Sequence, residues 1–163
     1  MIRRLEPHEI DLYRAIREEA LSTDPDAFGQ TLAVFTSRSE ADWARRLERG
    51  MTTPGAGILV DEADGQVRGM CGFGVNRDDP TEGYLWGMFV SPTARRQGIG
   101  LRMIEEATVA LTASGIRRIA ARVAAPNSDA LSFYEAAGFT VGEQIGTLRE
   151  GSQVPVHRIE KDV

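Results

Sequence analysis

The chain has 163 residues, 42% of them hydrophobic, which is enough for one buried core and predicts a single domain over residues 1–163. Its 19 basic and 24 acidic side chains give a net charge of -5, the wrong sign for a protein that binds nucleic acid. No apolar run reaches the roughly 20 residues of a membrane span, and one cysteine and two histidines provide neither a disulfide framework nor a metal site. We therefore expect a soluble, cytoplasmic protein without a metal ion.

The first third of the sequence predicts one strand and two helices. Residues 1–5 form a short apolar strand, and residues 7–21 follow with apolar side chains at helical spacing. A stretch with proline and glycine then interrupts the pattern. A second helix is predicted to begin after Ser39, a good N-cap, and to end at Gly50.

The middle of the chain predicts a three-stranded meander. Residues 57–75 contain two apolar runs around the pair Asp64-Gly65, which is a strong signal for a tight hairpin turn. Residues 83–90 are a third, aromatic-rich run that should pair with the hairpin. From Gly98 the apolar spacing changes to that of a helix, and this pattern ends at Gly115.

The last third predicts a strand, a helix and two more strands. Residues 116–123 alternate as a strand, and a helix should run from Asn127 to Gly138. Residues 139–148 and 154–163 close the chain as strands. The element order is therefore βααβββαβαββ, which predicts a mixed α/β fold.

An anion site is predicted where the helix at Gly98 begins. The first turn of a helix has unpaired N–H groups and a partial positive charge, so it stabilises an anion there. Arg95 and Arg96 add charge and donors, and we expect Gly98 and Gly100 to keep side chains out of the way. The Gly-Lys-Ser/Thr of ATP-binding loops is missing, and Met103 occupies the third small position of a dinucleotide fingerprint. A phosphate-bearing ligand other than ATP or NAD is the expectation.

Two motifs resemble those of the GNAT N-acetyltransferase superfamily. Arg95, Gly98 and Gly100 match its acyl-CoA signature Arg/Gln-x-x-Gly-x-Gly/Ala, and the second motif is matched by Asn127, Ala130, Phe133, Tyr134, Gly138 and Phe139. The element order also matches across the chain. The resemblance implies a mixed, largely antiparallel central sheet of about seven strands with a splayed central strand pair, flanked by about four helices.

The same resemblance implies acetyl-CoA as acyl donor and an amine-bearing acceptor. A deprotonated primary amine would attack the thioester directly, and Tyr134 would protonate the departing thiolate. The pyrophosphate would lie on the amides that open the helix, and the pantetheine along the preceding strand. The residues implied in cofactor binding are Met88, Phe89, Val90, Arg95, Arg96, Gln97, Gly98, Ile99, Gly100, Leu101, Asn127 and Tyr134.

A general base is less clearly marked. Strand alternation predicts that Glu82, Tyr84, Trp86 and Met88 share one face. Some members of the family have a glutamate where this chain has Tyr84, so we take Glu82, one pleat upstream, as the candidate catalytic base, acting through a water. The competing interpretation is a solvated carboxylate at the end of a strand.

The acceptor and the wider function stay open at this level. Asp24, Asp26 and Glu82 would suit a cationic amine, either in a small molecule or in a protein. The alternatives to an enzyme are a non-catalytic acyl-CoA-binding module, which need not keep Tyr134, and a domain that binds another nucleotide. A homodimer is compatible with the sequence.

Overall fold

The computed structural model describes residues 1–163, and all strands join one sheet of seven in the order β1-β2-β3-β4-β5-β7-β6. The strands are β1 (Ile2–Arg4), β2 (Gly57–Ala63), β3 (Gln66–Val75), β4 (Glu82–Val90), β5 (Arg118–Ala124), β6 (Thr140–Thr147) and β7 (Pro155–Asp162). The helices are α1 (Ile10–Thr23), α2 (Leu32–Thr36), α3 (Glu40–Thr52), α4 (Ile99–Thr112) and α5 (Ser128–Ala136). The expected fold class is confirmed.

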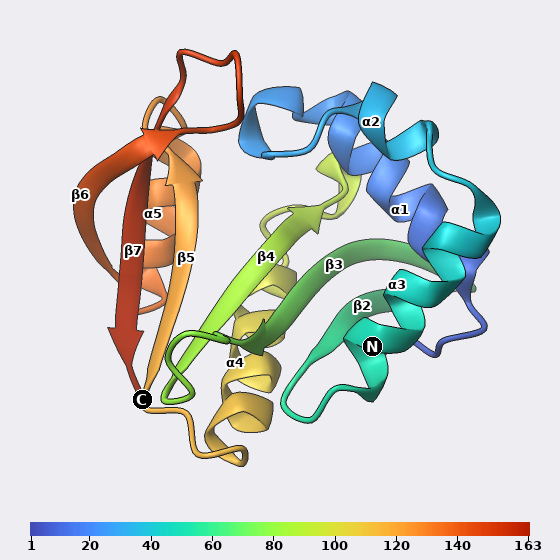
Figure 1. The fold of residues 1–163 in the computed structure, drawn as a ribbon, viewed down its shortest axis with the longest axis horizontal. Coiled ribbons are helices and arrows are strands. Elements are labelled where there is room, and N and C mark those ends of the chain that lie inside the picture. The colour runs from blue at the N-terminus through green and yellow to red at the C-terminus, as the bar shows by residue number, and fades with distance from the viewer.

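The helices form a layer on each face of the sheet, and each layer encloses its own core. In Figure 1, α3 lies in front of β2, α1 and α2 lie above β3, and α4 and α5 lie behind the sheet. The front core gathers around Phe35, Trp43 and Met70, and the rear core around Met103 and Ile119. None of these helices combines the length and apolar composition that crossing a membrane would require.

The sequence analysis missed helix α2, where it expected only an interruption. Thr31 caps this helix by accepting a hydrogen bond from the Val34 N–H at 3.2 Å. Phe35 anchors it, because its ring is buried against Trp43 with 4.3 Å between the centroids. A single turn of helix held by one aromatic side chain is too short for a periodic pattern to reveal.

The predicted end of the second helix at Gly50 is wrong. Helix α3 begins after Ser39, whose side chain accepts from the Asp42 N–H as expected, but it continues through Gly50 to Thr52. Thr53 has an extended backbone and precedes Pro54. A residue before proline is disfavoured in the helical region, so the proline ends the helix and not the glycine.

Gly50 and Gly65 should respond to alanine with opposite signs. Gly65 has φ +74° in the β2–β3 turn, so we expect Gly65→Ala to lower the free energy of unfolding by about 1 kcal/mol. Gly50 lies inside a helix with nothing within 4 Å of an added Cβ, so Gly50→Ala should raise it by about 0.5 to 1 kcal/mol. Urea denaturation of both variants measures the effects, and two changes of the same sign would contradict this account of the turn and the helix.

Strands β4 and β5 separate part of the way along the sheet. They pair in parallel only where Glu82, Gly83 and Tyr84 lie opposite β5, whereas β5 pairs with β7 along its whole length. The rest of β4, from Leu85 to Val90, has β3 as its only partner. The splayed strand pair that the family resemblance implied is therefore present, and it leaves one edge of β4 without a strand partner beyond Tyr84.

Candidate active site

The start of helix α4 has the geometry of an anion site. Arg96 and Gly98 both have left-handed backbones, with φ of 62° and 73°, so the chain curls just before the helix. The first backbone bond that closes the helix runs from the Arg102 N–H to the Gly98 carbonyl at 3.1 Å. The amides before Arg102 in this turn therefore point out of the helix end without an acceptor, as a bound phosphate requires.

Gly100 serves the packing of two helices, which differs from the reason expected. A Cβ at Gly100 would lie 2.8 Å from the ring of Phe133 on α5. A Cβ at Gly98 would meet only the end of the flexible Arg102 side chain, at 3.3 Å. Gly98 thus shapes the start of α4 through its left-handed backbone, and Gly100 lets α4 approach α5.

The two arginines before α4 differ in what they contact. The Arg95 guanidinium donates to the Val90 carbonyl at 2.9 Å and forms an ion pair with Asp24 at 2.7 Å. It therefore ties the end of β4 to the end of α1. Arg96 is exposed and makes no contact with a protein acceptor, so its guanidinium is the one available to an anion at this helix end.

A β-bulge interrupts β4 at Gly87. Gly72 pairs with Trp86 and Met70 with Phe89, so Gly87 and Met88 together lie opposite one residue of β3. Gly87 has φ +62°, which suits glycine. The expectation that Met88 shares the face of Trp86 is wrong, because the extra residue reverses the alternation: Met88 packs against the rear core and Trp86 against the front core.

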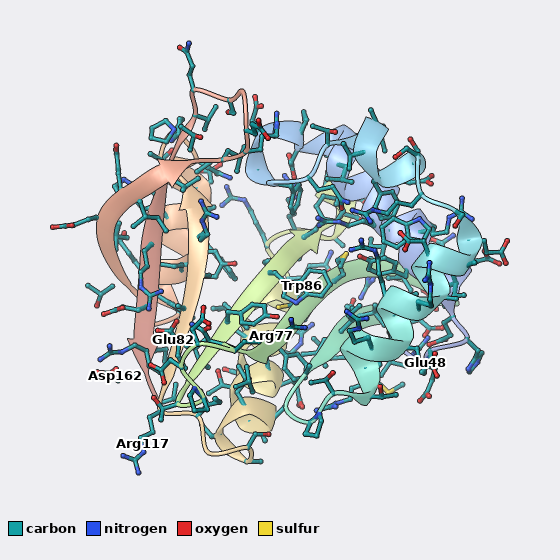
Figure 2. The ribbon with its side chains drawn as sticks, in the orientation of Figure 1. Glu48, Arg77, Glu82, Trp86, Arg117 and Asp162 are labelled. Carbon is teal, nitrogen blue, oxygen red and sulfur yellow. The ribbon has the colours of Figure 1, made fainter.

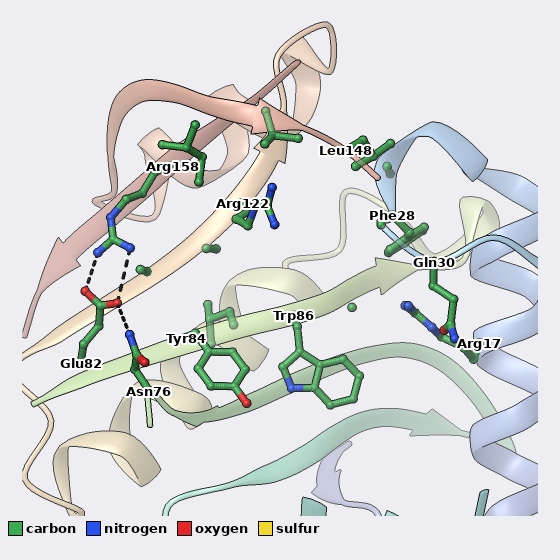
Figure 3. Close-up of a pocket in the computed structure, with 18 residues that line it drawn as sticks. Arg17, Phe28, Gln30, Asn76, Glu82, Tyr84, Trp86, Arg122, Leu148 and Arg158 are labelled. Atoms are coloured by element: carbon green, nitrogen blue, oxygen red, sulfur yellow. Dashed lines mark hydrogen bonds and ion pairs between the residues drawn. The ribbon is translucent and has the colours of Figure 1, made fainter. Parts of the chain in front are cut away.

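Two adjoining cavities occupy the gap between β4 and β5. The larger, of about 560 Å³, opens on the front face and extends from Glu82 and Arg158 to Arg17 (Figure 3). The smaller, of about 120 Å³, includes Asn127 and Tyr134 on the α5 side. Both share the wall formed by Ala27, Phe28, Leu85, Trp86, Gly87, Ala121 and Arg122. Together they reach the open edge of β4 from both faces of the sheet.

Tyr134 lies at the wall of the smaller cavity. Its ring packs edge-to-face against Phe133 at 5.1 Å and Phe139 at 5.4 Å, and only 7% of the residue is exposed. Its hydroxyl has no hydrogen-bond partner in the protein. Burial raises the pKa of this phenol well above its ordinary value, so the hydroxyl keeps its proton at neutral pH.

The other residues that the resemblance implies in cofactor binding differ in whether their side chains are accessible. Phe89 and Ile99 are buried, so only their backbones can contact a ligand. The Asn127 side chain caps α5 by accepting from the Ala130 N–H at 3.2 Å, and the residue also lines the smaller cavity. Gln97 accepts from the Arg102 guanidinium at 3.0 Å through its carbonyl.

Glu82 is a buried, paired carboxylate, and the expectation of a solvated strand end is wrong. It lies on the face of β4 away from α4 (Figure 2). Arg158 on β7 forms an ion pair with it, and Asn76 donates to its Oε1 at 3.1 Å, as the dashed lines in Figure 3 mark. Its side chain is only 11% exposed. Both of its carboxylate oxygens already accept hydrogen bonds from protein donors, which leaves them poorly placed to take a proton from an incoming amine.

We expect Glu82→Gln to leave the basic limb of the pH–rate profile unchanged and to lower the free energy of unfolding by about 1 kcal/mol. The amide can keep the hydrogen bonds to one oxygen, but its NH2 group is a donor that faces a donor of Arg158, and the charge that balances Arg158 is lost. Measurements of kcat/KM from pH 6 to 10 and urea denaturation test both effects. If the basic limb is lost while the fold persists, Glu82 is the general base that the sequence analysis proposed.

The three acidic side chains that the sequence analysis assigned to a cationic acceptor each lie beside an arginine. Asp24 pairs with Arg95, Asp26 lies 3.6 Å from Arg149, and Glu82 pairs with Arg158. The electrostatic argument for a cationic amine is therefore not supported by the structure. No group of three or more His, Cys, Asp or Glu side chains is placed to hold a metal ion.

Sequence reasoning missed most residues of the larger cavity, and two of those carried a signal in the sequence. Gly87 was identifiable, because an isolated glycine within a strand pattern signals a bulge. Arg17 was identifiable as a charged residue in line with Tyr13 and between the buried Ile16 and Ala20 of α1. Cys71 is buried, which raises the pKa of its thiol to about 12 and agrees with a packing role.

The sequence was compared with family models and with curated proteins. A sequence model of the acetyltransferase (GNAT) family matches residues 12–139. A search of curated protein sequences finds no match.

Solved structures of GNAT acetyltransferases share the fold. An acetyltransferase of the GNAT family from Streptococcus pneumoniae is similar with a TM-score of 0.83 and 20% identity over 100% of this chain and 98% of its own. A ribosomal-protein-alanine N-acetyltransferase from Brucella melitensis has a TM-score of 0.78 and 20% identity over 100% and 99%. A phosphinothricin acetyltransferase from Sinorhizobium meliloti, solved with acetyl-CoA, has a TM-score of 0.80 and 20% identity over 100% and 88%. The family match, the splayed strands and the anion site at α4 agree, and the chain belongs to the acetyltransferase (GNAT) family.

Proposed function

We propose that this chain is an acetyl-CoA-dependent N-acetyltransferase that acetylates a primary amine of a small molecule or of a protein. All of residues 1–163 would form this one domain, and it would work in the cytoplasm. Membership of the acetyltransferase family supports the proposal. So do the acetyl-CoA complex of the phosphinothricin enzyme and the N-acetyltransferase activity named for the Brucella relative.

One observation carries the proposal: the cavities meet along a single unpaired strand edge that leads to the α4 anion site. The pyrophosphate would bind the amides between Arg96 and Leu101, with Arg96 beside them. The pantetheine would lie along Met88 to Val90 and reach the smaller cavity. The acceptor would occupy the larger cavity on the front face. Donor and acceptor would thus meet at the wall that the two cavities share.

The chemistry needs one attacking group, one polarising group and one proton donor. The nitrogen lone pair of the neutral amine attacks the thioester carbonyl carbon, and backbone N–H groups on the open edge of β4 stabilise the resulting oxyanion. When the C–S bond breaks, the thiolate takes the phenolic proton of Tyr134, and the amide nitrogen loses its extra proton to water. Tyr134 regains a proton from solvent. The products are an N-acetyl amide and the CoA thiol.

Two experiments test the function in sequence. A thermal-shift screen with CoA, ATP and NAD should raise the midpoint with CoA alone. Release of the CoA thiol from acetyl-CoA should then depend on an added amine from a panel of amino acids, polyamines, aminoglycosides and N-terminal peptides. CoA binding without turnover on any amine would leave the non-catalytic acyl-CoA module as the function. Stabilisation by ATP or NAD instead of CoA would reject both.

A further inference from the structure

Arg17 is a buried guanidinium without a partner. It is only 6% exposed, and its Nε and Nη1 atoms are fully buried with no hydrogen-bond acceptor. No carboxylate forms an ion pair with it, and its one close partner is the ring of Phe28, 4.9 Å from the guanidinium carbon. Because a buried charge without hydrogen bonds destabilises a fold, a residue of this kind calls for an explanation. Burial also lowers its pKa.

In the proposed complex, the guanidinium would lie where the acceptor approaches the thioester. Arg17 lines the larger cavity, next to Gln30 and across from the Glu82–Arg158 pair (Figure 3). An added Cβ on Gly87 would be 3.2 Å from its Nη1, so the charge lies against the bulge of β4. The bulge is also part of the wall shared with the smaller cavity.

The charges around the larger cavity favour an anion. Its lining carries three guanidinium groups, those of Arg17, Arg122 and Arg158, and one carboxylate, that of Glu82. Arg158 is paired with Glu82, and Arg122 donates to the Thr147 carbonyl at 3.3 Å. Arg17 alone among them has no protein acceptor. The volume of about 560 Å³ is in the range of a site for a small molecule.

We propose that Arg17 binds a carboxylate of the acceptor, and that the acceptor is therefore a small amino acid in which an amine and a carboxylate lie a few bonds apart. This inference rests on the proposed N-acetyltransferase function. The carboxylate would supply the acceptor oxygens that Arg17 lacks. Because Nε and Nη1 are fully buried, the planar guanidinium would turn toward the cavity to bind both oxygens. With the carboxylate held beside Gly87, the amine of the same molecule is directed to the thioester.

The first test compares matched acceptors. CoA release is measured with amino acids, with their carboxamides and with the amines that lack the carboxylate. Wild type should prefer the carboxylate form by about 10- to 100-fold in kcat/KM, the size expected when a charge-assisted hydrogen bond is lost. In Arg17→Met this preference should disappear while the dissociation constant of CoA stays the same. Arg17→Lys should recover part of it, and Arg14→Met, on the same helix but outside the cavity, should keep all of it.

The thermal stability of the protein provides an independent test of the role of Arg17. Methionine fills a similar volume without a charge, so Arg17→Met should melt at a temperature equal to or higher than that of wild type. A purely structural arginine would give the opposite result. Loss of acceptor preference together with retained or increased stability therefore identifies a binding residue.

Two further results would overturn the inference while leaving the proposed function intact: equal turnover of amines with and without the carboxylate, or an unchanged preference in Arg17→Met. If no amine is turned over, the binding of product analogues still tests whether Arg17 recognises a carboxylate. N-acetyl amino acids should stabilise the CoA-bound wild type in thermal shift more than their carboxamides do, and this difference should be absent in Arg17→Met. No such difference in wild type rejects the carboxylate site.

Discussion

Tyr134→Phe is expected to lower kcat by about 10²-fold or more while acetyl-CoA affinity and the fold are retained. The phenylalanine keeps the edge-to-face contacts with Phe133 and Phe139 and removes only the hydroxyl. Because that hydroxyl has no protein partner, its loss leaves no buried group unsatisfied and has little effect on stability. The thiolate, in contrast, loses its proton donor. Single-turnover kinetics with saturating amine, together with calorimetry for CoA, measure the two effects separately.

The pH dependence provides a second readout for the same residue. The pKa of Tyr134 is raised by burial, so the donor stays protonated up to and beyond its ordinary pKa of 10. We therefore expect no loss of kcat from this group between pH 7 and 9.5. Turnover by Tyr134→Phe within about threefold of wild type, with chemistry limiting the rate, would assign Tyr134 to packing alone. Catalysis would then rest on polarisation by the backbone of β4.

Gly98→Val is expected to weaken CoA binding by about 10- to 100-fold. Gly98 has φ +73°, and a β-branched residue in that region adds about 1 to 3 kcal/mol of strain. The chain relieves the strain by moving the loop before α4, and the amides then no longer converge on the phosphates. Gly98 is exposed and an added side chain would meet only Arg102, so the core is left intact. Isothermal titration with CoA measures the loss.

The matched control is Gly98→Asn, because asparagine tolerates the left-handed region. It should bind CoA within about threefold of wild type. Gly100→Trp would not test the phosphate site cleanly, because a side chain at this position collides with Phe133 and disturbs the packing of α4 on α5. If Gly98→Val binds CoA as tightly as Gly98→Asn and keeps its circular dichroism spectrum, the pyrophosphate site lies elsewhere.

The fold and the conformation of the helix start at Gly98 were predictable because their signals are local. The turn at Asp64 and Gly65, the cap at Ser39 and the helix start at Gly98 each depend on a few neighbouring residues, and the structure has these features where the sequence predicted them. The periodic helices α1 and α4 were predictable for the same reason. The only α-helix that escaped prediction, α2, has five residues.

The composition of the larger cavity was less predictable because it depends on partners far away in the sequence. Glu82 looked like a solvated carboxylate, and its partner Arg158 is 76 positions away on a strand that reaches it only through the sheet order. The alternation rule placed Met88 with Trp86, and the Gly87 bulge separated them. Arg17 carried a signal, a charge on an apolar helix face, but its lack of a partner is visible only in three dimensions.

The break between β4 and β5 also bears on how the molecule opens. Only three pairs of residues link the two halves of the sheet through backbone ladders. Cooperative units revealed by hydrogen exchange follow such weak junctions. A thioester arm lying in the gap would bond to the free edge of β4 and contact α5, and so would couple two halves that are loosely joined without it. Slow exchange at amides on both sides of the gap would then report how fully the donor is bound, far from where its phosphates are held.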